Sequence, residues 1–425
     1  MMTREFNYWL TTFPESETPT SNLPEKTNVV VIGSGFSGCS AALELAKAGT
    51  SVCVLEAETI GWGASSRNGG MILTGLKLGP ETLISRYGIE RTQKMFALSQ
   101  AALNTVENYV TGEKIDCEFS RCGHLEMASK PAHFAAYSRT AEVMDKYFDH
   151  HVEIFPRQDQ SAEIGSNVYF GGLLDKTSAG VNPALLVRGL AQAAVRAGAQ
   201  IFEHTRVQKI ESTPGGVAVH TNRGIIHAEK VFAATNAYLG NFLPHLQKRI
   251  IPIGSYIIAT EPLPDSLAKE LIPRNRMVFD SLNYLHYFRL TPDQRMLFGG
   301  RAIFKPETEH TVRESVPILQ RDLLKVFPQL EKIPLDYAWG GTLDFALDNM
   351  PHTGRVGAIH HSIGFAGHGV AFATHLGKIV ASQMLGNPVD NPFEDLPFRQ
   401  VPFSKGIPFY LPMIGWYYKM LDLLF

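Results

Sequence analysis

The sequence predicts an α/β protein with a dinucleotide-binding domain and a second domain built on a mixed sheet. Two observations favour this fold class. Residues 28–56 read as a buried strand, a glycine-rich turn, a helix and a second strand, which is the repeating unit of parallel α/β sheets. Residues 250–260 and 284–301 alternate apolar and polar side chains with period two around turn residues, which is typical of antiparallel strands.

The turn of the first unit has the spacing Gly33-x-Gly35-x-x-Gly38. Gly33 permits a tight turn, Gly35 allows a pyrophosphate to approach the backbone, and Gly38 allows the helix to pack closely on the sheet. Glu56 ends the second strand at the spacing expected for a carboxylate that binds a ribose diol, and a Glu there argues against a 2′-phosphate. The alternative is a glycine-rich turn without a ligand, but the complete strand, turn and helix context favours the ADP half of FAD or NAD.

Charge and cysteine content exclude several classes of function. The chain has 425 residues, with 39 Lys and Arg against 41 Asp and Glu, so we expect no nucleic-acid partner. Cys39 and Cys53 fall in the predicted helix and strand of the first unit, while Cys117 and Cys122 lack CxxC spacing and a histidine pattern. The sequence therefore predicts no metal site. The first twenty residues contain no apolar signal-peptide core, which favours an uncleaved, cytoplasmic protein.

The last segment, residues 407–425, is interrupted by charge only at Lys419 and Asp422. No apolar run of the sequence reaches the ~18 residues needed to cross a bilayer. One interpretation is a tail helix packed on the body of the protein or on a partner subunit. The other is a membrane-surface contact with Trp416, Tyr417 and Tyr418 at the interface, which would make the protein membrane-associated.

A second run of small residues follows Glu56. Residues 61–70 read Gly-Trp-Gly-Ala-Ser-Ser-Arg-Asn-Gly-Gly. Small side chains, two hydroxyls and paired glycines let a loop run close to a flat or anionic ligand while it donates hydrogen bonds. We therefore expect this loop to continue along the cofactor, beyond the point where an NAD site usually stops.

The glycine turn with Glu56 and the 61–70 loop resemble the FAD-binding amino terminus of the D-amino-acid oxidase-like superfamily of FAD-dependent oxidoreductases. The loop is most similar to that of the gamma-glutamylputrescine oxidase branch, in which a glycine is more usual at the position of Ser66. Further segments match the superfamily at 230–238, 339–354 and 361–381. The resemblance spans about residues 28–384.

The resemblance implies a discontinuous Rossmann-like FAD-binding domain and a second mixed-sheet α+β substrate domain. The FAD-binding domain is assigned to residues 28–78, 179–247 and 336–390, the substrate domain with its helical insertion to 79–178 and 248–335, and the apolar tail to 391–425. From the residue pattern we also expect a long helix over 79–110, broken near Gly88, and a short strand at 115–119.

The resemblance also implies that FAD is held non-covalently, since no cysteine lies in residues 339–369. A second helix begins near Gly367 and Gly369, and its positive end would point toward the flavin pyrimidine. Together with the motifs above, this predicts that the cofactor is bound by Gly33, Gly35, Phe36, Ser37, Gly38, Glu56, Ala57, Ala64, Ser65, Ser66, Arg67, Asn68, Gly69, Gly70, Met71, Val207, Thr235, Asn236, Ala237, Gly340, Asp348, Gly367, His368, Gly369 and Val370.

The substrate pocket is expected on the alternating strands of the second domain, where aromatic, His and Arg side chains are concentrated. Tyr256, Tyr284, Tyr287 and Arg289 are the candidate substrate-binding residues, and His286, Arg301 and His368 are the candidate catalytic residues. Arg301 is the strongest single candidate, because the preceding Gly299 and Gly300 would let it approach the flavin. For each of the others, an ordinary structural role in the sheet is an equal alternative.

The resemblance implies oxidation of a primary or secondary amine, either gamma-glutamylputrescine-like or amino-acid-like, to an imine that water converts to an aldehyde or oxo acid. Dioxygen would be reduced to hydrogen peroxide. Three alternatives stay open: a dehydrogenase of the same fold that passes electrons to a membrane quinone, an amino-acid oxidase in which Arg301 or Arg289 clamps the acid, and an FAD-binding subunit without amine chemistry. The expected partners are thus a small-molecule amine and either dioxygen or a quinone, and no oligomeric state is predicted.

Overall fold

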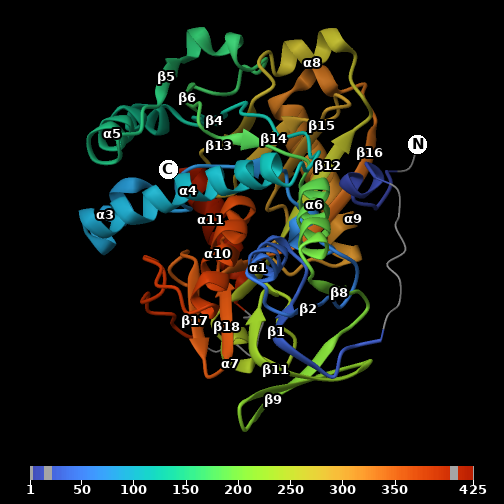
Figure 1. The fold of residues 1–425 in the computed structure, drawn as a ribbon. Helices are drawn as coiled ribbons and strands as arrows, with labels where there is room; N and C mark the ends of the chain where they lie inside the picture. Colours follow the sequence, from blue (N-terminus) through green and yellow to red (C-terminus); the bar gives the residue numbers. More distant parts are fainter. Residues whose placement is uncertain (1–2, 14–21, 403–409, 425) are drawn as a thin grey trace.

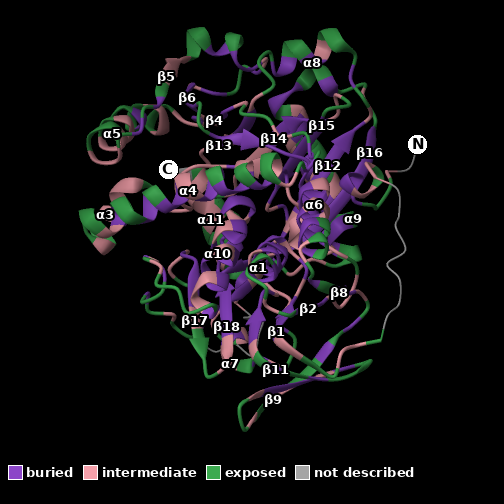
Figure 2. Ribbon diagram, viewed as in Figure 1, coloured by how far each residue is buried: buried purple, intermediate pink, exposed green. Residues whose placement is uncertain are grey.

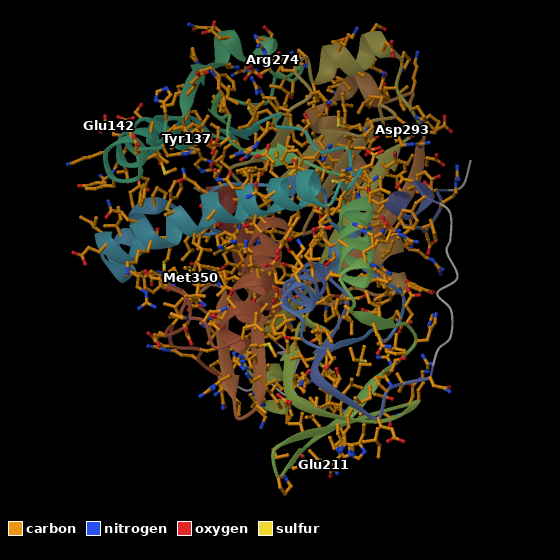
Figure 3. All side chains as sticks on the ribbon, viewed as in Figure 1. Tyr137, Glu142, Glu211, Arg274, Asp293 and Met350 are labelled. Atoms are coloured by element: carbon orange, nitrogen blue, oxygen red, sulfur yellow. The ribbon has the colours of Figure 1, made fainter. Side chains whose placement is uncertain are left out.

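The computed structural model describes residues 3–13, 22–402 and 410–424. Its strands form two large sheets that follow one another along the long axis of the molecule, with helices between and around them (Figure 1). Glu211, in a hairpin of the first sheet, and Arg274, next to the second sheet, lie at opposite ends of this axis (Figure 3). The architecture is the predicted α/β arrangement of a nucleotide-binding sheet and a mixed second sheet.

The first sheet has the strand order β17-β18-β11-β1-β2-β8, which is parallel from β18 to β8, and β10 and β9 continue from β11 as antiparallel strands. Residues 29–32 of β1 are all buried, as expected for a parallel strand that is covered on both faces. The strands of this sheet are β1 (Lys26–Ile32), β2 (Val52–Leu55), β8 (Gln200–Phe202), β9 (Val207–Thr213), β10 (Gly216–Thr221), β11 (Gly224–Ala233), β17 (His352–Val356) and β18 (Ile359–Ile363).

The second sheet has the order β16-β12-β15-β14-β13-β4-β6-β5 and is mixed, because β13 and β4 are parallel while the other pairs are antiparallel. A two-stranded sheet, β3 (Met71–Ile72) with β7 (Ala179–Gly180), lies apart from both. The strands of the second sheet are β4 (His124–Met127), β5 (Glu153–Pro156), β6 (Gly171–Asp175), β12 (Ile251–Thr260), β13 (Met277–Asp280), β14 (His286–Leu290), β15 (Met296–Gly300) and β16 (Leu335–Phe345).

The strand β16 lies in a different sheet from the one assigned from sequence. Residues 336–345 were placed in the FAD-binding domain, but β16 pairs with β12 along its length, from Ile251 opposite Phe345 to Thr260 opposite Leu335. The chain enters the first sheet only afterwards, at β17 and β18. β16 therefore links the two domains, because the chain passes from its end into β17 and β18 of the first sheet.

The helices match most of the sequence predictions. The helix expected over 79–110 is broken at Gly88, whose φ is 77°, while residues 115–119 form no strand. Asn182 caps the next long helix by accepting a hydrogen bond from the Leu185 N–H at 3.2 Å, as its position before Pro183 predicts. The helices are α1 (Phe36–Lys47), α2 (Ala64–Arg67), α3 (Pro80–Tyr87), α4 (Ile89–Gly112), α5 (Pro131–Phe148), α6 (Pro183–Arg196), α7 (Pro244–Gln247), α8 (Asp265–Leu271), α9 (Glu309–Val326), α10 (Gly369–Met384) and α11 (Leu411–Leu424), with 3₁₀ turns at Tyr8–Thr11, Arg157–Ala162 and Pro328–Leu330.

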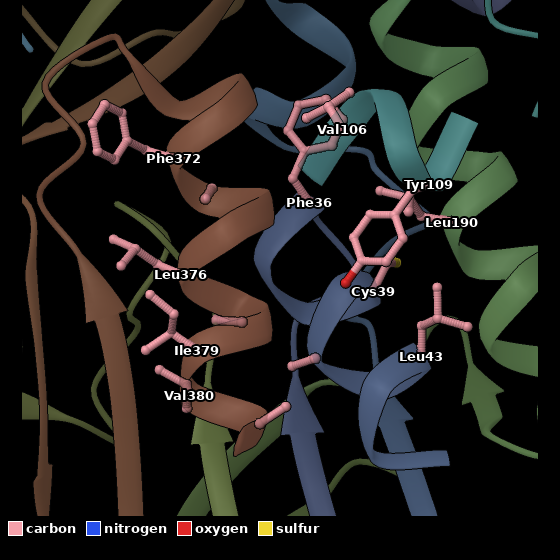
Figure 4. Close-up of a cluster of buried hydrophobic side chains, with 14 of the residues drawn as sticks. Phe36, Cys39, Leu43, Val106, Tyr109, Leu190, Phe372, Leu376, Ile379 and Val380 are labelled. Atoms are coloured by element: carbon pink, nitrogen blue, oxygen red, sulfur yellow. The ribbon is translucent and has the colours of Figure 1, made fainter. Parts of the chain in front are cut away.

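The main core lies where α1, α4, α6 and α10 meet beside the first sheet. Its side chains include Phe36 and Leu43 of α1, Leu190 of α6 and Leu376 of α10 (Figure 4), and the strands and inner helices form the buried interior of the molecule (Figure 2). α1 and α10 approach closely because Gly377 has no side chain: a Cβ there would lie 2.3 Å from the Ser37 carbonyl oxygen. This packing fixes the amino termini of the two helices relative to each other.

Candidate active site

The glycine turn between β1 and α1 is closed so tightly that side chains are excluded. Gly33 has φ of 100°, and a Cβ on it would lie 2.7 Å from the Ala234 carbonyl oxygen. A Cβ on Gly38 would lie 1.9 Å from the Gly33 carbonyl oxygen, and one on Gly35 would lie 2.8 Å from Ser65 Oγ. The amino terminus of α1 is therefore open to a ligand that approaches its backbone, as the motif predicts.

Glu56, which follows β2, lies beside this turn. Its carboxylate accepts hydrogen bonds from the Ser34 N–H at 2.9 Å and the Ser34 hydroxyl at 2.7 Å, and from the Glu58 N–H at 3.0 Å. These bonds hold the carboxylate at the carboxyl edge of the sheet. The Thr205 N–H donates to the Glu56 carbonyl oxygen at 2.7 Å, which brings the segment leading to Val207 to the same place.

The 61–70 loop contains α2 and packs on the amino terminus of α1. Ser65 Oγ accepts a hydrogen bond from the Phe36 N–H at 3.0 Å. Asn68 donates to the Ala64 and Ser65 carbonyl oxygens at 3.0 Å each and accepts from the Gly70 N–H at 2.8 Å. The loop therefore continues the ligand-facing surface of the first turn, as the sequence predicts.

Arg67 connects this loop to the second sheet. Its guanidinium donates to the Trp62 carbonyl oxygen at 2.8 Å and to the Gly340 carbonyl oxygen of β16 at 3.1 Å, and it lies 4.5 Å from the centre of the Trp62 ring. Glu307 lies 3.7 Å from it. In this structure Arg67 and Gly340 thus hold the two domains together, in addition to any contact with a cofactor.

The amino-terminal segment also holds the loop, which the sequence analysis did not predict. Asn7 donates to the Ser66 carbonyl oxygen at 2.8 Å, and the Trp9 indole N–H donates to the Asn68 carbonyl oxygen at 2.9 Å. Both side chains are buried. The concentration of aromatic residues around Asn7, with Phe6, Tyr8 and Trp9 before the first strand, was the available signal.

The second helix amino terminus, at α10, is shaped by a buried carboxylate. Asp344 of β16 accepts hydrogen bonds from the Gly364 N–H and, at 3.2 Å, from the Phe365 N–H. Burial raises the pKa of Asp344 to about 7, although these backbone donors oppose the shift. Gly367 has φ of 89°, and His368 follows as the residue before α10. The loop therefore presents Gly367 and His368 at the start of the helix.

Several buried polar atoms around these two helix ends have no hydrogen-bond partner among the described residues. They lie on four separate segments: the first turn of α1, α2, the end of β11 and the start of α10. Buried polar groups are almost always paired in folded proteins, so a cluster of unpaired ones indicates a polar ligand between these segments. The atoms are Ser37 Oγ, Ser66 Oγ, Thr235 Oγ1, Asn236 Oδ1 and His368 Nδ1.

A cavity of about 420 Å³ extends from α2 and the start of α10 to the second sheet, and this volume is within the usual range for small-molecule sites. Its wall includes part of the predicted cofactor site and part of the predicted substrate site. Of the candidate substrate and catalytic residues, Tyr287, Arg301 and His368 line it. The predicted cofactor residues in its wall are Ala64, Arg67, Asn68, Gly69, Met71, Gly367, His368 and Val370.

Three ionisable side chains from different elements also face this cavity. Arg301 follows β15, Lys77 follows β3, and Glu126 belongs to β4. The Arg301 guanidinium lies 5.0 Å from the centre of the Phe345 ring and has no ion pair or hydrogen bond with a described residue. Burial lowers its pKa. Lys77 and Glu126 were not predicted, although a single lysine within the small and apolar residues 71–80 was a signal.

The charged side chains that line the cavity shift one another's pKa values. Burial and the neighbouring Arg301 guanidinium lower the pKa of Lys77 to about 7. Burial raises the pKa of Glu126 to about 7, against the effect of Lys77. Burial and the Lys77 ammonium lower the pKa of His368 to about 3, so its imidazole is neutral. The cavity thus combines titratable groups with an apolar wall.

His286 does not line this cavity, because it lies on the opposite face of β14 from Tyr287. Its Nδ1 is 2.8 Å from Asp280 and its Nε2 is 3.6 Å from Asp322. Burial alone would lower its pKa, but bonding to the two carboxylates raises the pKa to about 9. A protonated, doubly paired imidazole is a poor proton acceptor at neutral pH, so the catalytic prediction for His286 has no support in the geometry.

Arg289 is also placed away from a substrate. Its buried guanidinium donates to the Gly70 carbonyl oxygen at 3.0 Å and to the Val181 carbonyl oxygen at 3.1 Å. These two carbonyls flank the junction of β3 and β7. Arg289 therefore fixes the end of the 61–70 loop, and it does not line the cavity.

The other predicted residues outside the cavity wall have identifiable structural roles. Tyr256 is fully buried in the core of the second domain. Tyr284 lies beside α11, where its ring contacts Phe304 at 5.7 Å. Asp348 accepts hydrogen bonds from the Met350 N–H and from His352 at 3.1 Å each, and so it stabilises the turn after β16. Tyr287, in contrast, lines the cavity and its hydroxyl lies 3.1 Å from Ser255 Oγ.

Comparison with known proteins agrees with this geometry. Residues 28–383 match the family model described as FAD dependent oxidoreductase. The chain belongs to this family. The probable oxidoreductase OrdL of Haemophilus influenzae is 34% identical over 407 residues, which cover 94% of this chain and 92% of that protein. The gamma-glutamylputrescine oxidoreductase of Escherichia coli is 34% identical over 402 residues, which cover 93% and 92%.

The fold of this FAD-dependent oxidoreductase is shared with solved flavoenzyme structures. Glycine oxidase from Geobacillus kaustophilus matches with a TM-score of 0.74 over 90% of this chain and 100% of that chain, at 20% sequence identity. L-proline dehydrogenase from P. horikoshii matches with a TM-score of 0.71 over 86% and 95%, at 22% identity. The predicted family, fold class and FAD cofactor are thus confirmed.

The residues present fit FAD. Gly33, Gly35 and Gly38 leave the backbone of the first turn accessible, and Glu56 provides an acceptor at the edge of the sheet. The unpaired Ser37, Thr235 and Asn236 atoms are suited to the phosphates, the ribose or their water shell. The α10 amino terminus and the 61–70 loop then border the cavity in which the reactive ring would meet a substrate.

Proposed function

We propose that this flavoenzyme oxidises a primary or secondary amine to an imine, which water hydrolyses to an aldehyde or oxo acid, and that dioxygen is the electron acceptor and yields hydrogen peroxide. One observation carries this proposal: a single cavity joins the FAD-holding segments at Gly69 and Gly367 to the half-buried charged groups Arg301, Lys77 and Glu126. When bound, FAD would accept a hydride from the carbon next to the amine nitrogen. The protein must therefore bind, orient and desolvate the amine.

The polar groups of the cavity favour a substrate amine that also carries a carboxylate. Arg301 is half-buried and has no carboxylate partner among the described residues, and a guanidinium pairs well with a bidentate anion. Glu126 could accept a hydrogen bond from an ammonium group of the same molecule. A gamma-glutamylated diamine has these groups, and the E. coli relative is named for such a compound; an amino acid has them at shorter spacing.

The apolar wall of the cavity would exclude water from the reacting end of the substrate. Leu73, Leu285 and Leu343 line the cavity next to Tyr287 and His368. Excluding water strengthens the interaction of the substrate with the charged groups. The neutral imidazole of His368 and the hydroxyls of Tyr287 and Ser255 leave this region without net charge of their own.

The test is anaerobic bleaching of the flavin in the purified protein with a panel of gamma-glutamylated and free polyamines, sarcosine, glycine, proline and D-amino acids. We expect at least one carboxylate-bearing amine to bleach the flavin, and air to restore the colour with one peroxide per turnover. A flavin that no amine bleaches would reject the proposal. Bleaching by diamines that lack a carboxylate would reject the assigned role of Arg301.

The helix α11 favours a second candidate, a dehydrogenase that passes electrons to a membrane quinone. One face of α11 packs on the body, where Asp422 accepts hydrogen bonds from the Tyr284 N–H at 2.8 Å and from Asn283. On its outer face Met413, Trp416 and Leu423 are 70%, 67% and 85% exposed. Within the described residues no helix combines the length and apolar character that crossing a bilayer requires, so such a contact would be interfacial.

Two measurements separate the candidates. The dehydrogenase predicts that the holoenzyme floats with phospholipid vesicles, that a Trp416→Glu variant does not, and that a soluble quinone analogue reoxidises the reduced protein faster than air does. An oxidase predicts rapid reoxidation in air, with stoichiometric peroxide, whether or not vesicles bind. Slow reaction with air and fast reaction with the quinone analogue would select the dehydrogenase.

A further inference from the structure

Lys77 is a charged residue in an otherwise apolar part of the cavity wall. It lies five residues after β3, on the same stretch of chain as the 61–70 loop and Met71, and its neighbours Leu76 and Leu78 also line the cavity. No described residue forms a hydrogen bond or an ion pair within 4 Å with its amino group. Lys77 is half-buried and opens onto the cavity, so its amino group is available to a ligand there.

The charged and titratable groups that share the cavity with Lys77 come from several elements. Arg301, after β15, is the strongest electrostatic influence, and Glu126 of β4 is the opposing one. His368, before α10, interacts with the Lys77 charge. Asp280 of β13, His124 of β4 and Asp175 of β6 also line the cavity. The Asp280 carboxylate is hydrogen-bonded to His286 and raises the pKa of Glu126. Lys77 is therefore placed between one fixed cation and one carboxylate that can stabilise its ammonium form.

We propose that Lys77 is a catalytic proton acceptor, whose neutral amine takes a proton from the substrate ammonium in the cavity and so delivers the neutral amine that can lose hydride. This inference rests on the proposed function. In the step one N–H bond of the substrate ammonium breaks and one N–H bond to Lys77 Nζ forms. No electrons change hands, and the substrate nitrogen regains the lone pair needed for the imine.

The surroundings of Lys77 favour both halves of this proton transfer, the loss of a proton by the substrate ammonium and its uptake by Lys77. Burial and Arg301 give Lys77 a pKa of about 7, so about half of it is neutral at neutral pH, whereas a free alkyl ammonium with a pKa of about 10.4 is ~0.04% neutral. The same burial and the same guanidinium act on a substrate ammonium bound beside Lys77 and favour its loss of a proton. Glu126 then stabilises the new ammonium on Lys77.

The experiment measures the second-order rate of anaerobic flavin bleaching against pH, with an amine that bleaches the wild-type holoenzyme. We expect a rising limb near pH 7 in the wild type. In Lys77→Met the limb should move toward the pKa of the free amine, near 10, and the rate at pH 7 should fall at least 100-fold. Lys94→Met is the matched control, because Lys94 is exposed and pairs with Asp390 on the surface; its profile should equal that of the wild type.

Two more variants separate proton transfer from charge and from folding. Lys77→Arg keeps a cation that cannot act as a base at these pH values, so it should behave like Lys77→Met. Glu126→Gln removes the group that stabilises the ammonium, so the limb should move to lower pH. A wild-type profile in Lys77→Arg, or an unmoved limb in Lys77→Met, would overturn the inference while the amine oxidation itself stands. A wild-type flavin that no amine bleaches would instead reject the proposed function.

Discussion

The contact between α1 and α10 makes a specific prediction about Gly377. Both helices direct their amino termini toward the FAD site, and Gly377 of α10 lies against the backbone of Ser37 in the first turn of α1. An added Cβ would be 2.3 Å from the Ser37 carbonyl oxygen and 3.0 Å from its Cα. Because these are backbone atoms, no rotamer change can relieve the contact. We predict that Gly377→Ala forces the two helices apart and weakens both folding and FAD binding.

The size of the effect follows from the overlap. Ordinary contact begins at about 3.4 Å, so the helices must separate by about 1 Å (3.4 minus 2.3). Overpacking of this kind costs about 3 kcal/mol, and alanine in a helix regains about 1 kcal/mol over glycine, which leaves a net loss of about 2 kcal/mol. Gly112, at the end of α4, is the matched control, because a Cβ there meets nothing within 4 Å. Gly112→Ala should stabilise the protein by up to about 1 kcal/mol.

The assay is urea unfolding of both variants with and without added FAD, together with the FAD dissociation constant from fluorescence quenching. We expect the two variants to differ by about 3 kcal/mol in the free energy of unfolding, and Gly377→Ala to bind FAD at least tenfold more weakly than the wild type. Equal stability and equal FAD affinity for Gly377→Ala and the wild type would refute the claim that this helix contact positions the FAD site.

Three further predictions concern residues around the site. Arg289→Met removes the guanidinium donor to the Gly70 and Val181 carbonyl oxygens, and Gly70 keeps only the Val181 N–H. We therefore expect a loss of about 2 kcal/mol in unfolding free energy and weaker FAD retention; a fully stable variant with a raised KM for carboxylate substrates would favour a clamp instead. Trp9→Phe removes the hydrogen bond to Asn68 and should cost about 1 kcal/mol, with faster FAD release measured by dilution. Pairing with the two carboxylates raises the pKa of His286 from 6.5 to about 9. The stabilisation of the fold by this pairing is therefore complete below pH 6.5 and is lost as the pH rises through 9. The loss in unfolding free energy is up to about 3 kcal/mol, from 2.5 pKa units at 1.36 kcal/mol each. His286→Gln should lack this decline in pH-dependent unfolding, and a parallel decline in both proteins would contradict the assignment.

The nucleotide-binding half could be predicted from sequence because its signals are local. Gly33, Gly35 and Gly38 all lie in the turn after β1 and the first turn of α1, and Glu56 follows directly on β2. The break of the helix at Gly88 is equally local, since a φ of 77° is available to glycine at little cost. Such features can be recognised from a few consecutive residues.

The substrate-binding residues were harder to predict from sequence, because a period-two pattern does not show which face of a strand meets the ligand. His286 and Tyr287 are neighbours in β14, and adjacent side chains point to opposite faces, so they could not both line one cavity. Tyr256 and Ser255 of β12 are divided in the same way, with Ser255 in the wall and Tyr256 in the core. Only the pairing of the strands decides between the two faces.

Other features depended on contacts between distant segments. Lys77 and Glu126 are separated by a long helical stretch and share no motif, yet they meet in one cavity. The assignment of β16 failed because its glycines suit either sheet, while its register with β12 is set by ten paired positions. The anchoring of the 61–70 loop by Asn7 and Trp9 likewise arises from tertiary packing.

The central claim is that the amino termini of α1 and α10 hold one FAD molecule per chain without a covalent bond. The most direct measurement is the flavin content of the purified protein and of the supernatant after acid precipitation. The account predicts a yellow protein with about one FAD per chain, all of which is released into the supernatant. A colourless protein that takes up no added FAD would contradict it, as would a flavin that stays with the precipitated chain.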